Sequence, residues 1–219
     1  MADTPLVYLL PESAQPGVDG NPRLHWPAGV DPFSAAAPLD ENPAQATVQL
    51  VLRAFTPDEC ARILHLGESG QPVTATTEKV TGYRSSVITW IHPNKDARWL
   101  YHRIGLLFLN ANRSYRFALA GLAEPLQFAR YGDSGHFEWH TDMGVQGTSS
   151  RKLSLTIQLV AADAYDGGNL EFLSLVRRTT PREPGTAIIF PSYLAHRVAP
   201  VTRGQRCSLV AWAYGPALR

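Results

Sequence analysis

The chain reads His136-Phe137-Glu138-Trp139-His140-Thr141-Asp142, and this short stretch organises the rest of the sequence. Side chains of an extended segment alternate between two faces, so His140 and Asp142 share one face with Thr141 between them. A second histidine from a distant strand, His196, would complete the two-histidine, one-carboxylate ligand set that leaves open positions on non-haem Fe(II). The pattern therefore predicts a non-haem iron site at His140, Asp142 and His196.

A His-x-Asp pair is a weak signal by itself, because a chain with seven histidines can contain one by chance. One alternative places His140 and Asp142 on a surface turn. Another makes His196 a histidine at the end of a buried strand, bonded to a backbone carbonyl. Glycines or prolines flank all three residues, which places them at strand edges from which a side chain can reach a cavity. This context favours the metal site.

Arg206 opens a run of apolar residues, 207–212, that is typical of a buried strand. A guanidinium is costly to bury unless an anion meets it, and its planar fork suits a carboxylate. The alternative is a surface arginine that buries only its aliphatic stem. The position of Arg206 therefore predicts that an anion such as a carboxylate pairs with it.

Several segments together resemble the iron(II)- and 2-oxoglutarate-dependent dioxygenases, and within them the prolyl-4-hydroxylase-like branch. The matching segments are Tyr131 to Asp142, Asp166 to Phe172, Leu194 to Gly204, and Arg206. The third segment is especially similar to bacterial PKHD-type hydroxylases. The resemblance covers about residues 126–214, with a weaker match from about residue 48. The combined motif is specific, unlike any of its pieces.

The resemblance implies roles for individual residues. His140, Asp142 and His196 would be the iron ligands, and Arg206 would pair with the distal carboxylate of 2-oxoglutarate. Tyr131 matches a tyrosine whose hydroxyl faces the cosubstrate.

Four other positions have less certain counterparts in the family. Gln158 stands where many relatives carry a tyrosine that helps to hold the carboxylate, so Ser208, on the same strand face as Arg206, is a second candidate. Trp212 matches a tryptophan near the iron, although packing alone also explains it. Arg84 resembles an arginine on the wall of the substrate groove, although an exposed cross-strand charge explains it equally well.

The family chemistry implies Fe(II) as metal, 2-oxoglutarate and O2 as cosubstrates, and ascorbate as a further cofactor. We expect hydroxylation of an unactivated C–H bond of a prolyl or other residue in a protein or peptide, with succinate and CO2 as co-products. Asp142 favours hydroxylation, because related halogenases leave this ligand position to chloride. A free amino acid or other small metabolite is the alternative substrate. A nucleic-acid base demethylase and a non-catalytic, structural or metal-binding jelly roll are further alternatives.

The composition is that of an ordinary globular protein of 219 residues, 44% of them hydrophobic, with a net charge of +1. The near-neutral charge, with no basic cluster denser than Arg177-Arg178, argues against a nucleic-acid partner. Cys60 and Cys207 are expected to be free thiols in a reducing compartment. Residues 6–10 are too short for a signal sequence, and we expect no membrane-spanning segment. The sequence predicts a cytoplasmic protein and sets no oligomeric state.

The predicted organisation is a proline-rich arm, residues 1–46, packed on an oxygenase domain, residues 47–219. The domain is expected to be mainly β, a double-stranded β-helix (jelly roll) over about residues 124–214, with N-terminal helices buttressing one sheet. Thr56 and Glu59 form a capping box for a helix from Pro57 to about residue 66 or 68, which Gly67 and Gly70 would end. A second helix, capped by Asn94, is expected over residues 95–112. Strands are expected at 48–55, 80–91, 125–131, 136–141, 152–160, 169–173, 186–190, 194–198 and 206–214.

Overall fold

The computed structural model describes residues 13–16, 22–25, 42–75, 82–173 and 180–216. The chain divides into two units, residues 1–42 and residues 43–219. In the first unit, β1 (Ser13–Pro16) pairs antiparallel with β2 (Pro22–His25), so part of the predicted proline-rich arm forms a two-stranded ladder. Other parts of the arm and the Arg177-Arg178 pair lie outside the described residues, and the packing of the arm on the body stays a prediction.

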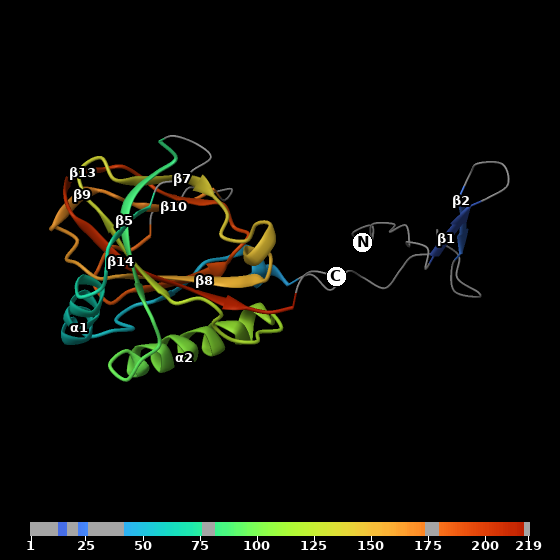
Figure 1. Ribbon diagram of the computed structural model, residues 1–219, viewed down its shortest axis with the longest axis horizontal. Helices are drawn as coiled ribbons and strands as arrows, with labels where there is room; N and C mark the ends of the chain where they lie inside the picture. Colours follow the sequence, from blue (N-terminus) through green and yellow to red (C-terminus); the bar gives the residue numbers. More distant parts are fainter. Residues whose placement is uncertain (1–12, 17–21, 26–41, 76–81, 174–179, 217–219) are drawn as a thin grey trace, which may run out of the picture. The chain divides into compact units, whose positions relative to one another are not determined.

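The second unit is built on an antiparallel sheet that curls over itself, ten-stranded within the described residues. The main part of the sheet consists, in spatial order, of β3 (Gln49–Val51), β11 (Ala187–Pro191), β8 (Arg151–Gln158), β14 (Arg206–Tyr214), β6 (Leu126–Tyr131), β5 (Arg84–Ile91) and β4 (Val73–Ala75). From β5 the sheet continues through β7 (His136–His140) and β12 (His196–Val198) to β10 (Leu170–Phe172). Figure 1 shows β7 and β10 on one side of β8 and β14, with both helices on the other. The predicted jelly roll with helices on one sheet is confirmed.

Two hydrophobic clusters fill the layers. One cluster joins the helices to the sheet, and the other lies inside the curl. Along β8, Leu153 belongs to the helix-side cluster, whereas the neighbouring polar residue Ser154 faces into the curl. This alternation follows from the period-two geometry of a strand. It directs a row of polar side chains toward the interior of the roll.

Both predicted helices exist, with one start confirmed and the other displaced. α1 (Pro57–Glu68) begins with the predicted capping box, in which Thr56 Oγ1 accepts from Glu59 N and Glu59 Oε2 accepts from Thr56 N. α2 (Arg98–Tyr115) starts and ends three residues later than predicted. Asn94 Oδ1 accepts from Ala97 N at 2.9 Å, so Asn94 closes the turn before α2 instead of capping the helix. Among the described residues, no helix is long and apolar enough to cross a membrane.

Some of the strand predictions were wrong in their bounds or missed a strand. The strand expected at 48–55 is limited to β3, because the chain turns at Arg53, where φ is +53°. β4, β9 (Tyr165–Gly167) and β13 (Val201–Gly204) were not predicted. β9 and β13 pair with each other, and Gly167 at the end of β9 adopts a φ of +70° with no room for a Cβ against Pro200 O. Each of these two strands is short and ends at a glycine, so the sequence shows no clear alternation of side chains there.

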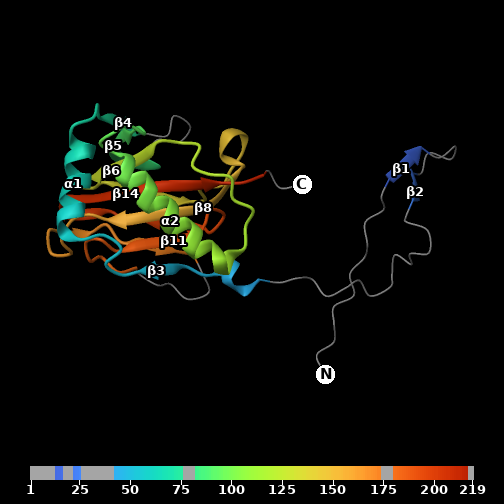
Figure 2. The same ribbon diagram turned by 90° about the horizontal axis from the view of Figure 1, so that it is seen from below.

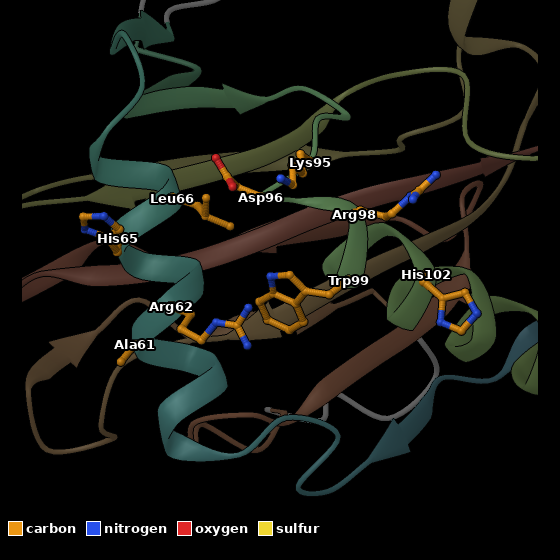
Figure 3. Close-up of a pocket in the computed structure, with 9 residues that line it drawn as sticks. All are labelled: Ala61, Arg62, His65, Leu66, Lys95, Asp96, Arg98, Trp99 and His102. Atoms are coloured by element: carbon orange, nitrogen blue, oxygen red, sulfur yellow. The ribbon is translucent and has the colours of Figure 1, made fainter.

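Gly67 was predicted to end α1 but lies within the helix. Its role is close packing, since a Cβ at this position would lie 2.3 Å from Cγ of Phe128 on the sheet. Figure 2 shows α1 and α2 lying across the same face of the sheet. Between the two helices is a surface hollow of about 950 Å³, where the Arg62 guanidinium stacks 4.2 Å over the Trp99 ring (Figure 3).

We expect Gly67→Ala to destabilise the protein by about 1–3 kcal/mol, because the added methyl group must displace Phe128 or separate α1 from the sheet. Gly105→Ala is the matched control within α2, since nothing lies within 4 Å of its Cβ position. This control should stabilise the protein by up to about 1 kcal/mol through helix propensity. Urea unfolding of both variants measures the difference, and a Gly67→Ala variant as stable as Gly105→Ala would contradict the packing role.

Candidate active site

Two histidines far apart in the sequence face each other across a pair of strands. His140 at the end of β7 is the register partner of His196 at the start of β12, and their ring centroids are 4.2 Å apart. Asp142 follows β7 by two residues, with Oδ1 3.8 Å from His140 Nε2 and Oδ2 3.5 Å from His196 Nε2. The candidate ligand atoms of all three residues lie within 4.8 Å of one another. The structure thus brings together the three residues that the sequence singled out.

Hydrogen bonds at Nδ1 leave the Nε2 atom of both imidazoles available to bind a metal ion. The Nδ1 atom of His140 lies 2.7 Å from Glu138 O, and Nδ1 of His196 lies 2.9 Å from Leu194 O. A carbonyl oxygen only accepts, so Nδ1 carries the proton in each ring and Nε2 keeps its lone pair. Two imidazole nitrogens and one carboxylate oxygen form the donor set that suits non-haem Fe(II).

The protonation states also fit a metal site. Burial, followed by the charge of nearby His196, lowers the pKa of His140 to about 4, so the imidazole is neutral at pH 7. Burial acts to raise the pKa of Asp142, but His196, His140 and the Ser154 hydroxyl outweigh it, and the pKa lies below its ordinary value. The site therefore presents a neutral imidazole at His140 and an ionised carboxylate at Asp142, which are the ligating forms of these two residues.

Aromatic rings fix the orientation of both imidazoles. Phe137 stacks on His140 with centroids 3.5 Å apart and planes inclined by 15°. Phe190 meets His196 edge-on at 4.7 Å, and Phe172 lies 5.8 Å from the same ring. Packed rings of this kind limit rotation about χ2, so both Nε2 atoms keep a fixed direction.

Arg206 lies in the same pocket, of about 570 Å³, as the three candidate ligands. Its side chain is buried, with Nη1 donating to Ser208 Oγ at 3.0 Å and Nη2 donating to Gln158 Oε1 at 3.3 Å. The guanidinium carbon lies 5.2 Å from the ring centroid of Tyr131. Gln158 and Ser208, alternatives in the sequence, both contact Arg206.

The Arg206 guanidinium has no counter-ion within the described part of the chain, and its Nε is buried without a hydrogen-bond partner. A buried, uncompensated charge is unfavourable unless an anion joins it. The pocket therefore fits a carboxylate ligand next to the candidate metal site.

Arg84 and Trp212 also line this pocket. Arg84 is held by Ser86 Oγ and Gln127 Oε1, each at 2.8 Å, and stacks over Phe137. The arginine is thus part of the pocket wall and not an exposed cross-strand charge. Trp212 is buried, with its ring centroid 6.5 Å from that of Trp90.

Sequence reasoning missed the residues that hold Asp142. It placed Asp142 on an extended segment, whereas β7 ends at His140 and Asp142 occupies a bend. Ser154 donates to Asp142 Oδ2 at 2.7 Å, and Arg151 donates to Asp142 O at 3.2 Å. Arg151 is itself paired with Glu124 at 2.6 Å. The alternation of polar residues with leucine and isoleucine along residues 152–158 was the available signal.

Three other histidines and the two cysteines do not line this pocket. His65, His92 and His102 are exposed, and Figure 3 shows His65 and His102 on opposite sides of the surface hollow. Within the described residues, no second group of three potential ligands converges. Cys60 and Cys207 are buried free thiols, and burial raises the pKa of each to about 11.

Comparison with known proteins places this site in context. A protein-family model described as the 2OG-Fe(II) oxygenase superfamily matches residues 126–214. A PKHD-type hydroxylase from Bordetella pertussis is 33% identical over 170 residues, which cover 72% of this chain and 74% of that protein. A PKHD-type hydroxylase from Hyphomonas neptunium is 35% identical over 100 residues, or 41% of this chain. That match spans about half of the relative, 45% of its length.

Two solved structures share the fold. A prolyl-4-hydroxylase from Pseudomonas putida superposes with a TM-score of 0.64 at 21% identity, covering 80% of this chain and 95% of that one. A prolyl hydroxylase from Trichoplax adhaerens, solved with a hypoxia inducible factor peptide fragment, gives 0.66 at 15% identity and covers 77% and 84% of the two chains.

Removing either imidazole should abolish stable metal binding, because two remaining ligands hold the ion far more weakly than three. We expect His140→Ala and His196→Ala, after anaerobic Fe(II) loading and desalting, to retain less than about one tenth of the iron bound by the unaltered protein. The exposed His92→Ala and His102→Ala variants are matched controls that should retain it all. Equal iron content in all four variants, measured by elemental analysis, would contradict the assignment of the ligands.

Proposed function

Because this chain belongs to the 2OG-Fe(II) oxygenase superfamily, we propose that it is a 2-oxoglutarate-dependent dioxygenase that hydroxylates an unactivated C–H bond. The observation that carries the proposal is the buried, uncompensated Arg206 guanidinium in one pocket with His140, Asp142 and His196. A purely structural jelly roll would gain nothing from burying that charge. A cosubstrate with a carboxylate neutralises it.

His140, Asp142 and His196 are the residues that would hold Fe(II). When bound, the metal supplies the activation of O2 that couples oxidative decarboxylation of 2-oxoglutarate to substrate hydroxylation. One oxygen atom enters succinate and the other enters the product alcohol, with CO2 as the third product. Ascorbate fits this chemistry as an accessory reductant.

Side chains of the protein itself would bind the distal carboxylate of 2-oxoglutarate. Ser208 and Gln158 orient the Arg206 fork by accepting from Nη1 and Nη2. The bound distal carboxylate would take the guanidinium's remaining donor capacity, and Tyr131 lines the same pocket. A diacid fixed at this end presents its other end toward the three ligands.

The wall of the pocket supports a protein or peptide substrate, such as a prolyl residue in a peptide. This wall combines charged and polar groups with an indole ring: Arg84, Glu124, Gln127, Arg151 and Trp90. Arg84, already oriented by two hydrogen bonds, is proposed to contact the substrate. Polar walls suit a peptide backbone, which offers repeated hydrogen-bond donors and acceptors. The two buried free thiols support a reducing compartment, the cytoplasm.

The direct test incubates Fe(II)-loaded protein and 2-oxoglutarate in air with peptides, free amino acids and protein extract. We expect succinate release coupled to a mass increase of about 16 Da on a peptide or protein, the mass of one oxygen atom. Coupling to a free amino acid instead would replace the peptide proposal by the metabolite alternative. Absence of succinate with every substrate would contradict the activity.

Arg206→Gln provides the matched residue test. It removes charge-assisted bonds worth about 1.5–3 kcal/mol each, so KM for 2-oxoglutarate should rise at least about 100-fold. Arg203→Gln is the control, because Arg203 is exposed and pairs with Asp166 on β9. Equal KM values for the two variants would remove Arg206 from cosubstrate binding.

A further inference from the structure

Asp142 differs from the two histidines in how the fold holds it. His140 and His196 lie on paired strands, whereas Asp142 lies in a bend beyond the end of β7. A carboxylate on a bend has no ladder to fix its direction. Another set of contacts must therefore set the orientation of Asp142.

Two buried serines provide these contacts. Ser154 on β8 donates its hydroxyl to Asp142 Oδ2 at 2.7 Å, and Ser154 Oγ lies 2.9 Å from Ser192 Oγ. Both serines have no measurable exposure. An ionised carboxylate only accepts and each hydroxyl has a single proton, so Ser192 must donate to Ser154. The hydrogen bonds thus run in one direction, from Ser192 through Ser154 to Asp142.

Both serines are anchored in the rigid part of the roll. Ser154 pairs with Phe190 on β11 and with Trp212 on β14. Ser192, directly after β11, donates its N–H to Lys152 O at 3.0 Å and accepts from Met143 N at 2.8 Å. Ser192 therefore holds the bend through its backbone and, by way of Ser154, through the carboxylate.

We propose that Ser154, polarised by Ser192, is a positioning residue that fixes the Asp142 carboxylate in its metal-binding orientation and thereby sets the affinity of the site. This inference rests on the proposed function, since it takes Asp142 to be a metal ligand. The hydroxyl occupies one lone pair of Oδ2 and prevents the carboxylate from rotating. Successive hydroxyl bonds strengthen each other in a buried environment.

The test measures Mn(II) affinity by the electron paramagnetic resonance signal of the free ion, using the full chain without metal. Ser154→Ala should weaken binding about 10–100-fold, the usual effect of losing a hydrogen bond to a metal ligand. Ser192→Ala acts only through Ser154, so its loss should be smaller. Thr89→Val is the control, because it removes a buried hydroxyl of the same sheet that has no hydrogen-bond partner. It should bind Mn(II) like the unaltered protein.

A double-mutant cycle separates positioning from a general structural effect. In an Asp142→Ala background, Ser154→Ala should produce no further loss of Mn(II) affinity, because there is no carboxylate left to orient. Urea unfolding of the metal-free variants shows whether each one folds. An equal loss of affinity in both backgrounds, or no loss in either, would overturn the positioning role of Ser154. Unchanged affinity in Asp142→Ala alone would instead overturn the ligand assignment of the proposed function.

Discussion

The register between β7 and β12 is the constraint on which the rest of the site depends. Pairing His140 with His196 places two imidazoles on one face of the curled sheet, and a shift by one residue would turn one ring to the opposite face. The register shift between His196 and Val198 lies within this pairing, so the ladder is irregular where the ligands converge. The flanking phenylalanine rings then hold each imidazole in place. Backbone pairing therefore brings the site together before any metal arrives.

The second constraint is electrostatic. The burial of Arg206 without a counter-ion lowers the stability of the protein when no ligand is bound. Arg206 is the first residue of β14, a central strand of the sheet. Asp142, also buried, is offset by hydrogen bonds and by the nearby imidazoles. One pocket therefore holds two separate charges, the Arg206 guanidinium without a counter-ion and the Asp142 carboxylate at the candidate metal site. This separation is a reason for the pocket to bind a metal and a dicarboxylate together.

Much of the fold and the centre of the site could be predicted from the sequence. The alternation of apolar and polar residues between glycines predicted the positions of the core strands. The His-x-Asp spacing, together with His196 and Arg206, predicted the residues that the structure brings together in one pocket. β9 and β13 were not predicted, because strands of three and four residues that end at a glycine show no detectable alternation of apolar and polar residues.

The support around Asp142 was also missed. Arg151 and Ser154 lie on β8 and Ser192 directly follows β11, and the alternation of polar residues along β8 does not show which side chain contacts Asp142. Ligands are constrained by chemistry and spacing, whereas the residues that orient them are constrained only by the three-dimensional packing. The displaced start of α2 has the same origin, since Asn94 satisfies a turn that precedes the helix.

The measurement that tests the account most directly is calorimetric binding of 2-oxoglutarate to the protein with and without Mn(II), in the absence of O2. A diacid held at one end by Arg206 and at the other by the metal must bind more tightly when the metal is present, and by linkage must tighten metal binding equally. We predict an affinity gain of at least about tenfold on adding Mn(II). Equal affinity with and without the metal, or no binding at all, would contradict the shared site.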